Sequence, residues 1–142
     1  MKAPEKSVRP ERELRVLRAG ELPVQLPEKA WLVRELWSHL AVGFIGGQPK
    51  SGKTWLALDL AVSVASGTPC LGRFPVDQPG LALAYLAEDS LPCVRERLAG
   101  LCAQRNVSLA SLDLHLVDTP GLRLDTGEDQ ARLIQAIARF KP

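Results

Sequence analysis

The segment from Gly47 to Thr54 constrains this chain more than any other feature. It reads Gly-Gln-Pro-Lys-Ser-Gly-Lys-Thr and fits the pattern G-x-x-x-x-G-K-[ST] at every fixed position. Its two glycines allow backbone angles that are closed to other residues, so several N–H groups can converge on one bound anion. A helix that begins where the loop ends adds the positive end of its dipole. The segment therefore predicts a phosphate-binding loop.

The residue types of this loop suggest separate roles. Lys53 would reach the β- and γ-phosphates of a nucleotide and is one of two predicted catalytic residues, and the Thr54 hydroxyl would hold a Mg²⁺ ion that bridges the same phosphates. Lys50 occupies a variable position, where it either adds charge near the phosphates or points into solvent; we favour solvent. The full predicted nucleotide-binding set is Gly47, Gln48, Pro49, Lys50, Ser51, Gly52, Lys53, Thr54 and Trp55.

The flanking residues predict the setting that such a loop requires, a strand before it and a helix after it. Leu40 to Ile45 is an apolar run without charge, which is typical of a strand buried on both faces of a parallel sheet. Over residues 53–66 only Asp59 and Ser63 interrupt the apolar interior, so we expect a buried helix. Gly67 stands at the expected C-cap position of this helix.

A second strand is predicted at Leu81 to Leu86, and acidic residues follow it at once. Ligands of parallel α/β sheets bind beyond the carboxyl ends of the strands, so Glu88 would project toward the same crevice as the loop. A carboxylate there can polarise an attacking water, which makes Glu88 the second predicted catalytic residue. The alternative is that Glu88 only favours the dipole of the next helix. We assign the capping of that helix to Asp89 or Ser90.

Strand and helix patterns continue to alternate along the chain. A helix is predicted over residues 91–104, a strand over 112–117, and a last helix that begins with a capping box of Thr126 and Asp129. This alternation predicts an α/β fold in which crossover helices join the strands of a parallel sheet. The predicted apolar faces are Val94, Leu98, Leu101 and Cys102 for the first of these helices and Leu133, Ile134, Ile137 and Phe140 for the last.

Residues 1–30 are predicted to be a leader, separate from a domain over residues 31–142. Basic side chains outnumber acidic ones over residues 1–18, and proline and glycine punctuate the rest. We interpret the leader as solvated, with a basic arm that touches DNA or a neighbouring subunit as the alternative. The segment that follows is expected to cover one sheet edge, unless Trp31 or Trp37 stacks on a nucleotide base instead.

Composition excludes few classes of protein. The net charge of +2 over 142 residues is too small to argue for nucleic-acid binding. No apolar run approaches the roughly 18 residues of a membrane span, and the basic N-terminus lacks a signal-peptide core, so we expect no membrane partner and a cytoplasmic protein. Cys70, Cys93 and Cys102 lack metal-ligand spacing and are expected to be reduced thiols, and His39 and His115 have no flanking ligand pattern.

Four stretches of the chain are similar to one known group of proteins. They are Gly-Gly-Gln-Pro-Lys-Ser-Gly-Lys-Thr-Trp-Leu-Ala-Leu-Asp-Leu-Ala at residues 46–61, Gly-Thr-Pro at 67–69, Leu-Ala-Tyr-Leu-Ala-Glu-Asp-Ser at 83–90 and Arg-Glu-Arg-Leu at 95–98. They resemble the RecA-like AAA family ATPases, P-loop NTPases typified by the plasmid replication helicase RepA. The resemblance implies ATP and Mg²⁺ as ligands of Lys53 and Thr54, and Glu88 as the catalytic base. It also implies a ring-shaped homo-oligomer that acts on DNA.

The resemblance further implies an apolar strand that follows the last helix and ends in the Walker B aspartate. The chain reaches Phe140-Lys141-Pro142 where this strand would begin. We therefore expect the chain to be truncated and to turn over ATP inefficiently by itself.

Two alternatives stay open at this point. Asp118-Thr119-Pro120-Gly121 resembles the D-x-x-G segment of P-loop GTPases, in which Asp118 would replace Glu88 as the key acid. No N-K-x-D guanine-specifying motif is visible in the sequence. The second alternative is a nucleotide-binding or subunit-contact module without turnover of its own.

Overall fold

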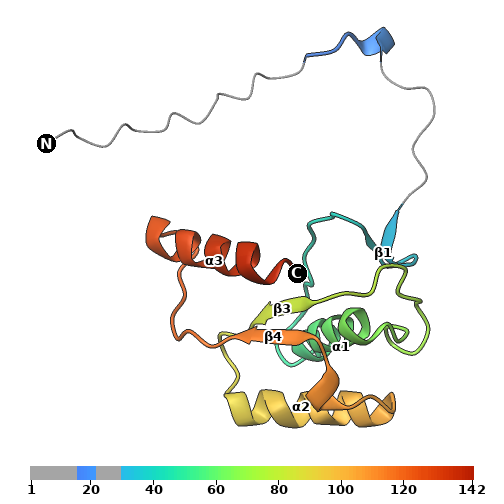
Figure 1. Cartoon of the computed structure of the whole chain (residues 1–142), viewed down its shortest axis with the longest axis vertical. Coiled ribbons are helices and arrows are strands. Elements are labelled where there is room, and N and C mark those ends of the chain that lie inside the picture. The colour runs from blue at the N-terminus through green and yellow to red at the C-terminus, as the bar shows by residue number, and fades with distance from the viewer. Residues whose placement is uncertain (1–15, 22–29) are drawn as a thin grey trace, which may run out of the picture.

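The computed structural model describes residues 16–21 and 30–142 (Figure 1). At its centre lie two parallel strands, β3 (Ala82–Tyr85) and β4 (Leu114–Val117), which pair in register along their whole length. Parallel strands require a crossover connection, and the one between β3 and β4 contains a helix. The predicted α/β fold with a parallel sheet is therefore present, with two strands in the described part of the chain.

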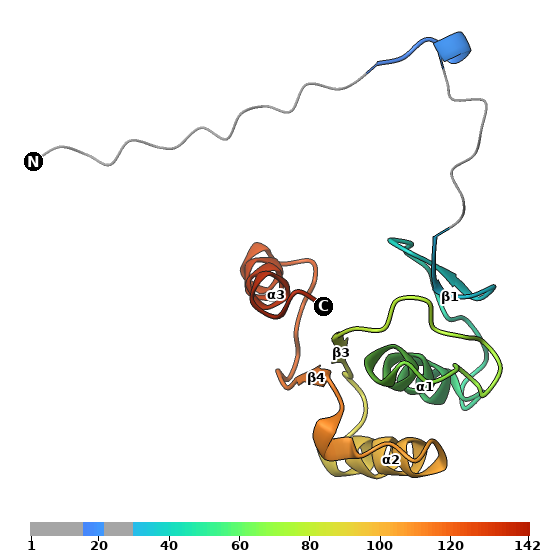
Figure 2. The same cartoon turned by 45° about the vertical axis from the view of Figure 1, so that its right-hand side comes forward.

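Three helices flank this sheet on its two faces. α1 (Lys53–Ser66) and α2 (Leu91–Gln104) pack against each other on one face, and α3 (Gly127–Phe140) lies on the opposite side (Figures 1 and 2). The bounds of α1 and α2 are those that the sequence predicts. Gly67 ends α1 in the left-handed conformation at φ 72° and donates its N–H to the Ser63 carbonyl, which confirms the predicted C-cap.

A second, smaller sheet precedes the phosphate loop. β1 (Trp31–Val33) pairs antiparallel with β2 (Trp37–Ser38), and Val33 also bridges to Val76. This segment was expected to cover an edge of the parallel sheet, and it forms a separate hairpin instead. Two 3₁₀ turns, η1 (Ala19–Glu21) and η2 (Leu109–Ser111), complete the described elements. Most of the leader predicted over residues 1–30 lies outside the described residues.

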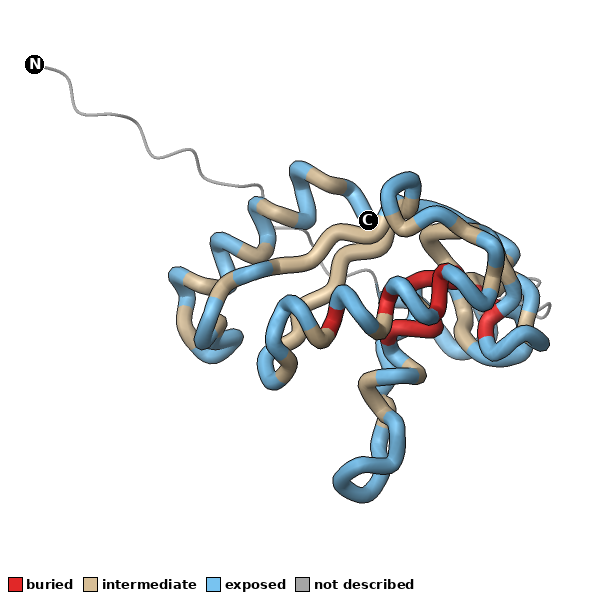
Figure 3. The backbone as a smooth tube through the Cα atoms, turned by 90° about the horizontal axis from the view of Figure 1, so that it is seen from below, coloured by how far each residue is buried: buried red, intermediate tan, exposed pale blue. Residues whose placement is uncertain are grey.

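The hydrophobic core lies between α1, α2 and the sheet. Leu58 and Val62 of α1 meet the buried residues of α2, which form the predicted stripe of Val94, Leu98, Leu101 and Cys102. In Figure 3 the buried residues accordingly concentrate on these two neighbouring helices. Alternate residues of β4, Leu114 and Leu116, add to the core because side chains of a strand point to opposite faces in turn.

α3 is less buried than its sequence predicts. No residue of this helix is fully buried, and Ile134 and Ile137 are exposed. Its contact with the sheet includes Phe140, whose ring centroid lies 4.7 Å from that of His115 on β4. The predicted capping box is wrong. Asp129 accepts from the Arg123 N–H at 2.9 Å, and the Thr126 hydroxyl donates to the Arg123 carbonyl, so both side chains stabilise the preceding turn.

The strand predicted at Leu40 to Ile45 is also wrong for the described part of the chain. Residues 41–47 are assigned to no strand, and Val42 and Phe44 are 94% and 97% exposed. An apolar run becomes a strand only where a neighbouring strand supplies partners for its N–H and C=O groups. In the described part of the chain β3 and β4 pair with each other, and residues 41–47 pair with neither of them.

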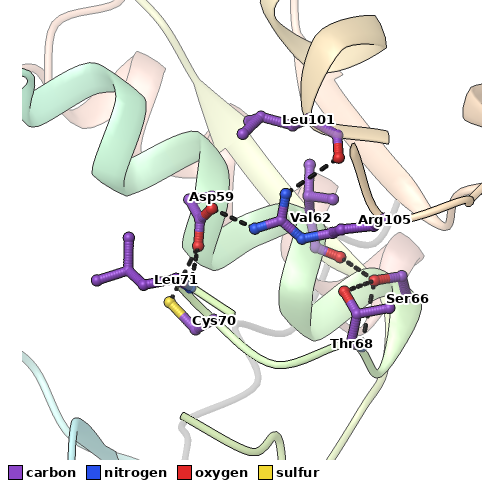
Figure 4. Close-up of polar contacts among 8 residues, drawn as sticks. All are labelled: Asp59, Val62, Ser66, Thr68, Cys70, Leu71, Leu101 and Arg105. Atoms are coloured by element: carbon purple, nitrogen blue, oxygen red, sulfur yellow. Dashed lines mark hydrogen bonds and ion pairs between the residues drawn. The ribbon is translucent and has the colours of Figure 1, made fainter. Parts of the chain in front are cut away.

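A polar cluster joins α1, the C-terminal end of α2 and the loop after α1 (Figure 4). The buried Asp59 carboxylate forms an ion pair with Arg105, and it accepts the Leu71 N–H at 2.8 Å and the Cys70 thiol at 3.2 Å. Burial raises the pKa of Cys70 to about 12, and the adjacent Asp59 carboxylate acts in the same direction. Asp59, predicted as an interruption of an apolar helix, is therefore the centre of a buried network.

The three cysteines form no disulfide, which confirms the expectation of reduced thiols. Cys70 and Cys102 are buried, whereas Cys93 is half-buried. Across residues 16–21 and 30–142, the helices are all too short or too polar to span a membrane.

Candidate nucleotide-binding site

The loop from Gly47 to Thr54 runs directly into the N-terminus of α1. Gly52 is the N-cap of that helix and has φ 86°, a left-handed conformation that favours glycine. At Gly47 a Cβ atom would lie 2.7 Å from the Ser51 hydroxyl oxygen, which a rotation of the Ser51 side chain would move away. The backbone angle therefore demands glycine at position 52, whereas the space around position 47 makes no comparable demand.

This loop borders a cavity of about 630 Å³ at the N-terminal end of α1. Glu88 and Asp89, which follow β3, line the same cavity together with Arg97 of α2. The structure therefore brings the two predicted catalytic residues, Lys53 and Glu88, to one place from distant parts of the sequence. The loop residues that line the cavity are Pro49, Lys50, Ser51, Gly52, Lys53, Thr54 and Trp55.

Gly47 and Gln48 are not among the lining residues, yet they contact the central cation of the site. The Lys53 ammonium donates to the Gly47 carbonyl at 3.1 Å and to the Gln48 carbonyl at 2.8 Å. Neutral carbonyls are weaker partners for an ammonium than phosphate oxygens, because hydrogen bonds between two charged groups are shorter and stronger. A polyphosphate in the cavity would therefore compete well for Lys53. Lys50 is exposed, as we favoured, but it also borders the cavity.

Glu88 has the exposure that a base for water requires. It is solvent-exposed, and it makes no hydrogen bond or ion pair with any other described residue. Asp118, the corresponding acid of the GTPase alternative, does not line the phosphate-loop cavity. It lines a neighbouring cavity of about 220 Å³ beyond the carboxyl ends of β3 and β4, and Asp89 lines both cavities. Glu88, and not Asp118, therefore borders the same cavity as the phosphate loop.

Arg97 is a site residue for which no role was predicted. Its guanidinium forms an ion pair of 2.7 Å with Asp89 and lies 5.6 Å from the centroid of the Trp55 ring. Capping was predicted for Asp89 or Ser90; Ser90 is the N-cap residue of α2, but its side chain makes no capping hydrogen bond. The spacing in the sequence was the available signal for this ion pair. Arg97 lies about two turns into α2, so its long side chain can reach back to Asp89, which precedes the helix.

The two tryptophans considered for base stacking lie away from the loop. Trp31 and Trp37 belong to the β1–β2 hairpin, and neither lines the phosphate-loop cavity. Trp37 borders a different cavity of about 430 Å³ with Leu40 and Ala41. Trp55 is the tryptophan that reaches the site, and it is about half exposed.

Comparisons with known proteins agree with this geometry at the level of the family. No curated protein and no solved structure matches the chain. A family model described as an AAA domain matches residues 7–141, which is nearly the whole chain. This assignment supports nucleotide binding and ATPase activity, and a small parallel α/β sheet with a glycine-rich loop at a helix N-terminus fits a P-loop NTPase-like fold. By its sequence the chain belongs to the AAA domain family.

Proposed function

We propose that this chain binds Mg-ATP through residues 47–54 and hydrolyses it with Glu88 as the base. The observation that carries the proposal is one cavity lined both by the phosphate loop at the N-terminus of α1 and by Glu88 beyond the end of β3. The phosphate loop suits a polyphosphate, and Glu88 supplies an exposed carboxylate beside it. The RecA-like class, within the broader family, is part of the proposal and is supported by the segments at residues 46–61 and 83–90.

The residues present fit both the nucleotide and the metal. The N-terminal N–H groups of α1 and the Lys53 ammonium would bind phosphate oxygens, while the Thr54 hydroxyl would hold the Mg²⁺ ion. Hydroxyl and carboxylate oxygens border the same cavity, and these are the donors that Mg²⁺ prefers. When bound, the ion neutralises charge on the phosphates. Glu88 would accept a proton from water as the water oxygen bonds to the γ-phosphorus and the bond to the bridging oxygen breaks.

Substitution of Lys53 tests the binding part of the proposal. Lys53→Ala removes a charged donor, and hydrogen bonds to charged groups contribute about 1.5–3 kcal/mol, so ATP affinity should fall at least about tenfold. Isothermal titration with Mg-ATP measures the change. Arg95→Ala, an exposed position on α2 outside the cavity, is the matched control. Equal affinity of Lys53→Ala and the wild type would contradict the assignment of the loop.

Substitution of Glu88 tests the catalytic part separately. A positioned general base contributes about 10²–10⁴ in rate, so Glu88→Gln should slow single-turnover hydrolysis by about that factor while ATP still binds. Undiminished hydrolysis by this variant would rule out the base role. If the wild type binds ATP through Lys53 but never turns it over, the chain is a nucleotide-binding module without catalysis. A tenfold preference for GTP over ATP would instead favour the GTPase alternative.

We also propose a DNA-directed role in an oligomeric ring of the RepA type. The proposal is supported by the resemblance of residues 46–61 and 83–90 to that group, and the finer roles in replication or unwinding rest on the same residues. Stimulation of ATP hydrolysis by single-stranded DNA, together with a change of mass on adding Mg-ATP in light scattering, tests it. Identical rates and mass with and without DNA and nucleotide would contradict the proposal.

A further inference from the structure

The pair formed by Asp89 and Arg97 lies at the edge of the phosphate-loop cavity, and both residues line it. Their side chains are 21% and 23% exposed, so the pair is only partly solvated. The guanidinium also lies over the face of Trp55, the residue that follows the Lys-Thr of the loop. Asp89 is thereby connected to the N-terminal turn of α1 through one arginine, and that arginine adjoins the surface where phosphates would bind.

Three cations border the cavity, Lys50, Lys53 and Arg97, and the last two are already hydrogen-bonded to the protein. Lys53 donates to two neutral carbonyls, whereas Arg97 donates to a full negative charge. The difference affects how readily each cation can exchange its present partner for the oxygens of a polyphosphate. Carbonyls release Lys53 readily, but a carboxylate competes with phosphate oxygens on nearly equal terms because both accept charge-assisted hydrogen bonds.

We propose that Asp89 is an inhibitory latch, which holds Arg97 against Trp55 and withholds its guanidinium from the phosphates of a bound nucleotide. The inference rests on the proposed nucleotide site and adds a control of affinity to it. Arg97 exchanges the Asp89 carboxylate for phosphate oxygens on binding, and no covalent bond changes. A protein whose binding-competent form is only partly populated has an affinity reduced by that fraction.

The latch predicts that two single substitutions act in opposite directions. Asp89→Asn keeps the size of the side chain and removes its charge, so Arg97 is released; because partly exposed pairs are worth up to about 1 kcal/mol, affinity for Mg-ATP should rise up to about fivefold. Arg97→Ala removes a phosphate donor, and affinity should fall about tenfold. A purely structural ion pair would make both variants weaker.

A double variant separates the latch from simple repulsion between Asp89 and phosphate. Loss of a negative charge beside the site raises affinity even without Arg97, so the benefit of Asp89→Asn must be measured again in the Arg97→Ala background. The latch predicts that the benefit disappears there. Titrations with Mg-ATP and with inorganic tripolyphosphate at constant ionic strength, on the full 142-residue chain, supply both measurements, and Arg95→Ala is the control on the same helix.

The outcomes distinguish this inference from the proposed function. Tighter binding of both probes by Asp89→Asn, abolished by Arg97→Ala, supports the latch. If binding depends on Lys53 but Asp89→Asn does not tighten it, or tightens it equally without Arg97, the latch is wrong and the nucleotide site stands. An effect seen with ATP but not with tripolyphosphate also overturns the latch, because the guanidinium would then act on the nucleoside. If no variant binds either probe, the proposed function fails together with the latch.

Discussion

The buried pair of Asp59 and Arg105 predicts a large and specific loss of stability on substitution. Asp59→Ala removes the partner of a guanidinium whose side chain is only 9% exposed, and it also leaves the Leu71 N–H without its carboxylate acceptor. Removing one member of a buried ion pair costs about 3–5 kcal/mol, because the remaining charge stays in a poorly solvated place. Domains of this size have a free energy of unfolding of about 5–15 kcal/mol, so the variant should lose a large share of it.

Urea denaturation followed by circular dichroism measures this loss. With a urea dependence of about 2 kcal/mol per molar, a loss of about 4 kcal/mol lowers the midpoint by about 2 M. The chain contains its own control in the pair of Arg34 and Asp77, joined at 2.9 Å, whose arginine side chain is 57% exposed. Asp77→Ala should cost no more than about 1 kcal/mol. Equal midpoints for Asp59→Ala and Asp77→Ala would refute the argument that burial makes the first pair important.

Two further predictions concern the thiols and the exposed face of α3. Because the pKa of Cys70 is raised from 9.0 to about 12, its contribution to stability is complete below pH 9 and is lost as the pH rises toward 12, by about 1.4 kcal/mol per pH unit. The free energy of unfolding of the wild type should therefore fall faster over this range than that of Cys70→Ala, and parallel curves would contradict the prediction. On α3, Ile134→Lys should change stability by less than about 0.5 kcal/mol, whereas Leu58→Ala in the core should cost about 2–5 kcal/mol; similar losses in thermal unfolding would disprove this contrast.

Local signals in the sequence were enough to predict the helices around the site. Gly67 and the almost unbroken apolar run before it indicated α1, and the apolar face of Val94, Leu98, Leu101 and Cys102 indicated α2. These signals depend on residues within a few positions of one another, which is why they could be recognised without a structure. The phosphate loop belongs to the same class, since its two glycines act within eight residues.

Features that depend on distant partners were predicted poorly. Residues 40–45 have the composition of a strand, but composition does not supply a neighbouring strand. Asp59 was predicted to interrupt a helix because its partner, Arg105, is 46 positions away. Arg97 had no assigned role because its place beside Trp55 depends on how α2 packs against α1. The position of Glu88 at the cavity was predictable because parallel α/β sheets bind ligands beyond the carboxyl ends of their strands.

The exposed apolar run at residues 40–45 has a consequence for handling the protein in solution. It is uncharged, contains no proline and is rich in residues that favour extended structure, and its backbone is assigned to no strand in the described part of the chain. Segments with this composition are templates for edge-to-edge association and aggregation. Preparations should therefore become turbid with rising concentration, and a lysine at Val42, where the side chain already faces solvent, should act as a gatekeeper that keeps the protein dispersed.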